Sequence, residues 1–101
     1  MEKKKPHYSL KEIQQVVDLR KTSAFTATAL IGAAELGLSP DETISVVLAL
    51  RQTDFYKSMT TYADHQIWQD VYHAKLKSRL TAYIKVTLRE NWIVVIQFKE
   101  K

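Results

Sequence analysis

The hydrophobic pattern changes its period near the middle of the chain, and this change limits the possible folds more than any other feature. From Leu80 to Leu88 apolar and polar residues alternate strictly, which predicts an antiparallel strand with one face buried. Asn91 lies in the turn that follows and can adopt a positive φ there. Three further strands are predicted, at residues 56–59, 68–76 and 92–99.

The first half of the chain instead repeats apolar residues at the spacing of a helix. Three helices are predicted, at residues 9–20, 27–36 and 39–50. Ser9 and Ser39 are each followed three residues later by a glutamate, as in a capping box, and Gly37 suits a left-handed helix end. Helices followed by strands indicate an α+β fold, with the N-terminal helices packed on one face of a C-terminal antiparallel sheet.

The chain has the size of a single domain, residues 1–101, and carries no cysteine. A disulfide scaffold, a cysteine nucleophile and thiolate zinc sites are therefore excluded. The N-terminal residues lack the apolar run of a secretory signal, and no window approaches the roughly 18 to 20 apolar residues of a membrane span. We expect a cytoplasmic domain that makes no membrane contact.

The net charge of +4 is placed unevenly. Acids and bases cancel over residues 1–50, so the whole excess lies in residues 51–101. The run from Lys75 to Arg89 contains five cations and no acid. A one-sided basic surface attracts polyanions such as nucleic acids, although a solvated face that keeps the protein soluble gives the same pattern.

Residues 54–72 combine large aromatic side chains with many hydrogen-bonding ones. The aromatic residues are Phe55, Tyr56, Tyr62, Trp68 and Tyr72. Rings interleaved with a lysine, hydroxyls and amides suit a surface that stacks RNA bases and binds phosphates. They suit equally a half-buried strand with a polar loop, or a protein–protein interface.

Strand periodicity places several polar residues on one face of the predicted sheet. Tyr83 and Lys85 share a face, as do the odd-numbered residues from Gln69 to Lys75 on the preceding strand. The better candidates for the helix-covered face of that strand are Trp68, Tyr72, Ala74 and Leu76. Gln69, Tyr83, Lys85 and Lys57 are therefore expected to meet on the open face, the one that no helix covers.

The remaining chemical motifs are weak. His7, His65 and His73 are the only histidines, and they lack the spacing of a metal site, so no metal is predicted. The chain has two glycines, too few for a phosphate-binding loop, and no other cofactor is predicted.

Residues 33–45 have the form of a helix–turn–helix motif. In such motifs the second helix reads DNA with its N-terminal residues, but Asp41 and Glu42 stand there and repel phosphate. A helical hairpin of the core explains the segment better. A non-catalytic nucleic-acid-binding regulator, which would use this hairpin or the basic sheet, is the alternative function.

The segment that carries the aromatic residues matches a known family. Asp54–Tyr62, Asp64–His65 and Ile67–Tyr72 closely resemble the MqsR family of toxin–antitoxin mRNA interferases. The likeness extends over essentially the whole chain. It includes the stretches Met1–His7, Glu35–Leu38, Tyr83–Lys85 and Phe98–Lys101.

This resemblance implies a RelE/YoeB-like form of the α+β fold. It also implies a metal-independent endoribonuclease that cuts mRNA at short GCN-type sites without the ribosome. The implied partner is an antitoxin that binds zinc through its N-terminal part and DNA through its C-terminal part. Operator DNA would be bound only through that antitoxin, and the pair would regulate its own operon.

The resemblance also assigns site residues. The family's catalytic residues fall on Lys57, Gln69 and Tyr83, for phosphate charge, phosphate orientation and proton transfer respectively. The residues expected to bind RNA are Tyr56, His73, Lys75, Lys85 and Lys99. The stretch from His73 to Arg79 shows no firm family pattern, which leaves the cleavage preference open. His73 itself is either an added acid or base near neutral pH or a surface residue.

Overall fold

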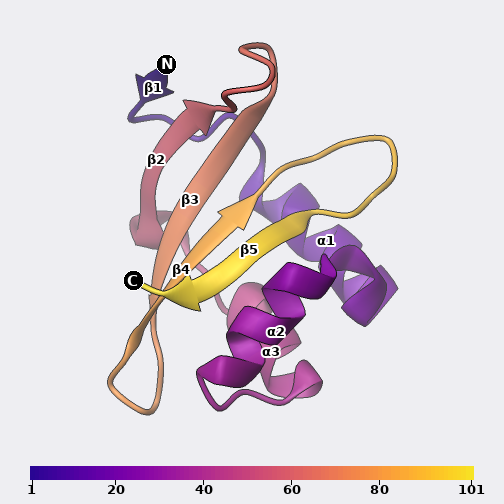
Figure 1. Cartoon of the computed structure of the whole chain (residues 1–101), viewed down its shortest axis with the longest axis vertical. Helices are drawn as coiled ribbons and strands as arrows, with labels where there is room; N and C mark the ends of the chain where they lie inside the picture. Colours follow the sequence, from indigo (N-terminus) through magenta and orange to yellow (C-terminus); the bar gives the residue numbers. More distant parts are fainter.

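The computed structural model describes residues 1–101 and places three α-helices on one side of a five-stranded antiparallel sheet (Figure 1). The helical elements are α1 (Leu10–Arg20), η1 (Lys21–Ala24), α2 (Ala27–Glu35), α3 (Pro40–Leu48) and η2 (Gln52–Asp54), where η marks a 3-10 helix. The strands, in pairing order, are β1 (Glu2–Lys3), β2 (Phe55–Thr60), β3 (Trp68–Lys75), β4 (Thr81–Val86) and β5 (Val95–Glu100). The α+β prediction is confirmed. None of the helices has the length and apolar content to cross a membrane.

The helix ends use most of the signals read from the sequence. Ser39 and Glu42 form a reciprocal capping box at the start of α3. Gly37 has a φ of 82°, the left-handed conformation expected where the chain leaves α2. At α1 only half of the predicted box forms, because the Ser9 hydroxyl accepts the Glu12 N–H without a return bond. The connection between α2 and α3 is therefore fixed locally.

The core lies between the helices and one face of the sheet. Tyr72, Ile84 and Phe98 from β3, β4 and β5 are buried in it, together with Val17 of α1 and Val47 of α3. The alternation predicted for residues 80–88 is confirmed within β4, where even-numbered residues are buried and odd-numbered residues are half-buried, but beyond its ends Leu80 is exposed and Thr87 is buried. The helices thus pack on one face of the sheet, and no helix covers the other face.

Helix α2 lies unusually close to β5. A Cβ atom at Gly32 would come within 1.8 Å of the Phe98 carbonyl oxygen, so only glycine fits at this crossing. Just before the helix, the Thr26 N–H donates to the Val95 carbonyl at 3.0 Å and its hydroxyl donates to the Ile96 carbonyl at 3.1 Å. These contacts fix α2 against the sheet edge.

The connection between β4 and β5 differs from the prediction. β4 ends at Val86 rather than Leu88, and β5 begins at Val95 rather than Trp92. The positive φ falls on Trp92, at 58°, and not on Asn91. The side-chain oxygen of Asn91 accepts the Ile93 N–H, and the backbone carbonyl of Asn91 accepts a hydrogen bond from the Arg20 guanidinium. Glu90 and Asn91 are the central residues of the turn, which the Trp92 N–H closes by donating to the Arg89 carbonyl, and the left-handed residue follows directly after them.

We expect Gly32→Ala to lower the free energy of unfolding by about 1–3 kcal/mol, because the added methyl group forces α2 away from β5. Chemical denaturation measures the change. The matched control is Thr28→Ala, on the exposed side of the same helix, which should be neutral or slightly stabilising. Equal stability of Gly32→Ala and the unmodified protein would contradict the close approach.

Candidate active site

The open face is built from two adjoining rows of residues that pair across the strands. The first row contains Lys57, Val71 and Lys85, and the second contains His73, Tyr83 and Lys99. Residues two apart in a strand share a face, so all of these project away from the helices. The prediction that Lys57, Tyr83 and Lys85 share the open face is confirmed.

Gln69 and Lys75 extend this face along β3 in opposite directions. Gln69 lies opposite Met59 of β2, on the far side of the first row from His73. Lys75 lies opposite Thr81 at the other end of β3 and is exposed. The predicted catalytic residues therefore come from three neighbouring strands, with Lys57 placed between Gln69 and the second row.

A β-bulge brings Tyr56 onto the open face beside Lys57. The pairing of β2 with β3 shifts between Phe55 and Lys57, which leaves Tyr56 as the extra residue. Its ring stacks on His73, with centroids 4.3 Å apart and planes at 24°. His73 is in turn 5.9 Å from the Tyr83 ring. Three rings thus lie side by side across β2, β3 and β4.

Lysines surround the Tyr83 end of this row. The Lys99 ammonium lies 5.1 Å from the Tyr83 ring centroid, and the Lys85 ammonium lies 5.9 Å from it. Burial lowers the pKa of Lys85 below its ordinary value, and the positive charges of Lys99 and Lys57 lower it further. The face therefore concentrates positive charge in a partly desolvated place, which favours the binding of an anion.

The Lys57 ammonium is engaged by a carboxylate from the N-terminus. It donates to the Glu2 carboxylate, and the Lys57 side chain is 19% exposed against 58% for Glu2. This hydrogen bond raises the pKa of Lys57 and lowers the pKa of Glu2. Lys57 is therefore firmly cationic, and an arriving phosphate has to replace Glu2 as its partner.

Glu2 reaches Lys57 because the N-terminal arm, residues 1–8, is bound to a buried carboxylate. Asp70 accepts the backbone N–H groups of His7 and Tyr8, at 2.9 to 3.1 Å, and the Ser58 hydroxyl at 2.6 Å. Asp70 is fully buried on the side of the sheet opposite Lys57. The bound arm then runs along β2 as β1, an element that the sequence did not predict.

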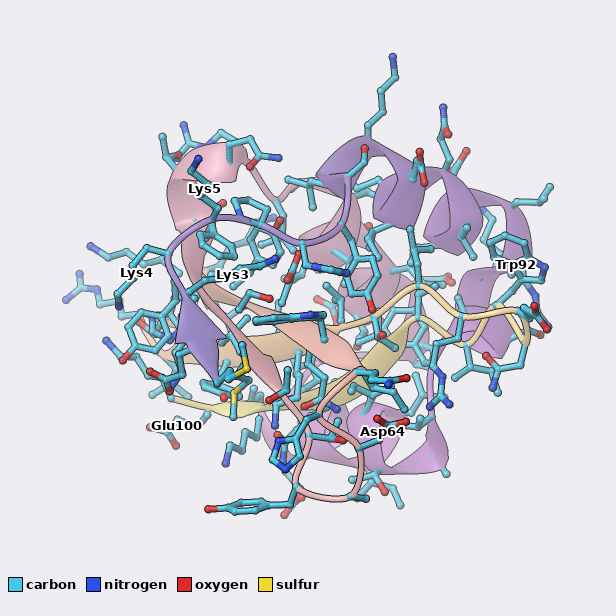
Figure 2. The ribbon with its side chains drawn as sticks, turned by 90° about the horizontal axis from the view of Figure 1, so that it is seen from above. Lys3, Lys4, Lys5, Asp64, Trp92 and Glu100 are labelled. Atoms are coloured by element: carbon cyan, nitrogen blue, oxygen red, sulfur yellow. The ribbon has the colours of Figure 1, made fainter.

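The arm also covers Trp68, which was expected to pack beneath the helices. His7 instead stacks on the Trp68 ring at 5.3 Å and 17°, and the Lys3 ammonium lies 4.1 Å from the ring centroid. Figure 2 shows Lys3, Lys4 and Lys5 along this arm, on the opposite side of the molecule from Trp92. Lys3 therefore lies on the Asp70 side of the sheet, whereas the Lys4 ammonium, 5.2 Å from the Tyr56 ring centroid, adds a cation beside the open face.

Only part of the predicted basic run joins the open face. Lys75 and Lys85 lie in strands, whereas Lys77, Arg79 and Arg89 lie in the turns that connect them. The other cations of the face come from β2 and β5, at Lys57 and Lys99. The charge run therefore correctly locates the basic surface in the second half of the chain, but it does not identify which cations lie on the open face.

A groove of about 1200 Å³ opens beside the second row of the open face. Its lining includes Tyr56, His73 and Lys75 from the sheet, together with apolar side chains such as Val46 and Leu50. Nowhere do three or more His, Cys, Asp or Glu side chains form a group able to hold a metal ion.

Two residues of the site were missed in the sequence, Glu2 and Asp70. No periodicity links Glu2 to Lys57, which is 55 residues away. Asp70 did carry a signal, because it stands in the otherwise apolar, helix-facing set of residues 68–76. A carboxylate in such a position needs hydrogen-bond donors, and here an arm from outside the sheet supplies them.

Two comparisons define the class of protein to which this fold and face belong. The chain matches, over residues 5–100, the family described as "Motility quorum-sensing regulator, toxin of MqsA". It is 43% identical, over the full length of both chains, to the protein named mRNA interferase toxin MqsR from Escherichia coli (strain K12). The chain therefore belongs to the MqsR toxin family, and the resemblance noted in the sequence is confirmed.

We expect Asp70→Ala to release the N-terminal arm and to lower the free energy of unfolding by about 3 kcal/mol, because three donors lose their acceptor. Hydrogen exchange at the backbone amides of His7 and Tyr8 should become fast. Asp18→Ala, on an exposed part of α1, is the control. Retained protection of these two amides in Asp70→Ala would show that another contact holds the arm.

Proposed function

We propose that this chain is the toxin of a type II toxin–antitoxin system and acts as an endoribonuclease on mRNA. The observation that supports this most is the meeting of Lys57, Gln69 and Tyr83 on one cation-rich open face. The family and the name of the E. coli relative point to the same activity. Ammonium, amide and phenol groups can promote phosphate transfer by positioning and charge alone, so no metal is required.

In the proposed reaction the ribose 2′-OH attacks the adjacent phosphorus, and the products are a 2′,3′-cyclic phosphate and a free 5′-hydroxyl. Lys57 neutralises the charge that grows on the non-bridging oxygens, and Gln69 orients the same phosphate by hydrogen bonding. Tyr83 transfers a proton at the 2′-OH or at the leaving oxygen. Lys57 is suited to the first role because its pKa is raised, which keeps it charged.

The residues around this set form the proposed RNA-binding surface. Tyr56 and His73 supply rings for base stacking, and Lys75, Lys85 and Lys99 bind the backbone phosphates. Binding of this kind weakens steeply with salt because counterions are released from the RNA.

The finer parts of the proposal concern the cleavage site and the partner. We assign to the chain ribosome-independent cutting at GCN-type sites and neutralisation by a zinc-binding, DNA-binding antitoxin. Operator DNA would be reached through that antitoxin. The family description, which names a toxin of MqsA, supports the existence of a partner protein. Acting on mRNA places the protein in the cytoplasm.

A helix–turn–helix regulator is less well supported. The first turn of α3 exposes Asp41 and Glu42, which repel DNA phosphates, and Ile44 and Val47 of the same helix are buried in the core. Regulation through the basic sheet without cleavage remains the competing function. It predicts RNA binding that leaves the RNA intact.

Purified protein should cut an RNA with a GCN-type site in excess EDTA and leave the two ends named above. Lys57→Ala and Tyr83→Phe should each slow cleavage about 100-fold or more, because each removes a group that acts on the transition state. Lys11→Ala, an exposed lysine of α1, is the control for lost charge. Intact RNA, or cleavage abolished by EDTA, would contradict the proposal.

We expect Glu2→Gln to tighten the binding of RNA a few-fold, because phosphate no longer has to displace a carboxylate from Lys57. Fluorescence anisotropy with an RNA that carries 2′-O-methyl groups measures binding without cleavage. Glu35→Gln, at the exposed end of α2, makes the same charge change elsewhere. Unchanged affinity in Glu2→Gln would show that the ion pair does not compete with RNA.

A further inference from the structure

The proposed catalytic residues leave one step of the reaction without a suitable group. Attack by the ribose 2′-OH requires a base that is unprotonated near neutral pH. Lys57 is excluded, because its hydrogen bond to Glu2 raises its pKa and keeps it protonated. Gln69 is not a base in water, and a neutral tyrosine is a proton donor with a reference pKa of about 10. The site needs a further residue.

His73 occupies the position where such a base would act. Its side chain is half-buried, so one part stays accessible to a ligand. It pairs across the strands with Tyr83, and its ring is 5.9 Å from the Tyr83 ring and 4.3 Å from the Tyr56 ring. Lys57 lies in the adjoining row. A phosphate held by Lys57 beside Tyr83 therefore has His73 as its neighbour.

The surroundings of His73 keep the imidazole neutral. Burial lowers its pKa below the ordinary value of 6.5, and the nearby charge of Lys101 lowers it further. The neighbouring groups on the open face are mostly phenols and cations, namely Tyr56, Lys57, Lys75, Tyr83, Lys85, Lys99 and Lys101, and the Glu2 carboxylate there is bound to Lys57. Lys4 lies above the Tyr56 ring, and across the groove stand Asp41, Glu42, Arg51 and Asp54. None of these acids forms a hydrogen bond or salt bridge with His73.

We infer that His73 is a catalytic residue of this face, the general base that takes the proton of the ribose 2′-OH. The inference rests on the proposed function. The O2′–H bond breaks as the proton moves to a ring nitrogen of His73, and O2′ forms a bond to phosphorus. The bond from phosphorus to O5′ breaks, and O5′ takes the proton of the Tyr83 hydroxyl. The imidazolium and the phenolate then exchange a proton through water, which restores both groups.

This assignment fixes the role of Tyr83, for which two proton transfers were open. With His73 as the base, Tyr83 is the acid at the leaving oxygen. The phenolate that forms there is stabilised by Lys99 and Lys85, whose ammonium groups lie 5.1 Å and 5.9 Å from the ring centroid. The two proton-transfer groups are neighbours on adjacent strands, as a single phosphate between them requires.

A purely stacking role for His73 is the competing explanation, and two substitutions separate it from catalysis. His73→Phe keeps an aromatic ring beside Tyr56 but has no nitrogen, whereas His73→Gln keeps polar atoms but has no ring. If His73 is the base, both variants should lose about 100-fold or more in single-turnover cleavage rate at neutral pH. His73→Phe, which keeps the stacking ring, should bind a 2′-O-methyl RNA within a few-fold of the unmodified protein, whereas His73→Gln should bind it more weakly because it also loses the ring.

The pH dependence gives the decisive readout. The rate of the unmodified protein should fall tenfold per pH unit below the pKa of His73, which lies under 6.5, and this acidic limb should disappear in both variants. Added imidazole should restore part of the rate in His73→Ala. The matched control is His65→Gln, an exposed histidine in the loop between β2 and β3, which should keep both the rate and the limb.

Cleavage by His73→Phe at the unmodified rate, or with an unchanged acidic limb, would overturn the assignment of the base and leave the nuclease proposal standing. If Lys57→Ala and the unmodified protein both leave RNA intact, the nuclease proposal itself fails, and this inference fails with it. Thermal unfolding of each variant shows whether a lost rate reflects a lost fold.

Discussion

The ion pair between Lys57 and Glu2 on the open face depends on a carboxylate that is buried on the opposite face. Asp70 lies in β3 on the side of the helices, where an unpaired carboxylate would cost several kcal/mol. The N–H groups of His7 and Tyr8 satisfy it, and this contact holds the N-terminal arm against the sheet. The preceding residues then pair with β2, which brings Glu2 to Lys57. The buried Asp70 carboxylate thus determines that Glu2 is the partner of Lys57 on the other side of the sheet.

The helices cover only one face of the sheet, so the open face has to bury its own apolar residue. Val71 is fully buried there although no helix covers it. It lies between Lys57 and Lys85 in the first row, and lysine stems can cover apolar surface while their ammonium groups stay in water. Burial, together with the charges of Lys99 and Lys57, lowers the pKa of Lys85, so the side chains around Val71 also favour an anion. The lysines of the first row therefore serve both to cover Val71 and to bind an anion.

The sequence predicts those parts of the fold that depend on local rules. Alternation located β4, and the capping signals located the connection between α2 and α3, because each depends on neighbouring residues. The shared face of Lys57, Tyr83 and Lys85 followed from period two once the strands were placed. The bulge at Tyr56 could not be predicted in this way, because it depends on how two strands pair. Strand β1 could not be predicted either, because its position follows from a contact with Asp70, which is more than 60 residues away.

Lys57 and His73 have different surroundings on the open face. These surroundings determine that Lys57 carries the positive charge and that His73 accepts the proton. The hydrogen bond to Glu2 raises the pKa of Lys57, whereas burial and the charge of Lys101 lower the pKa of His73, so Lys57 stays protonated and His73 stays neutral. The reverse assignment would require Lys57 to lose its proton beside Glu2 and His73 to gain one among lysines. When a phosphate replaces Glu2, one negative charge replaces another beside Lys57. Lys57 therefore keeps an anionic partner throughout, which maintains its charged form.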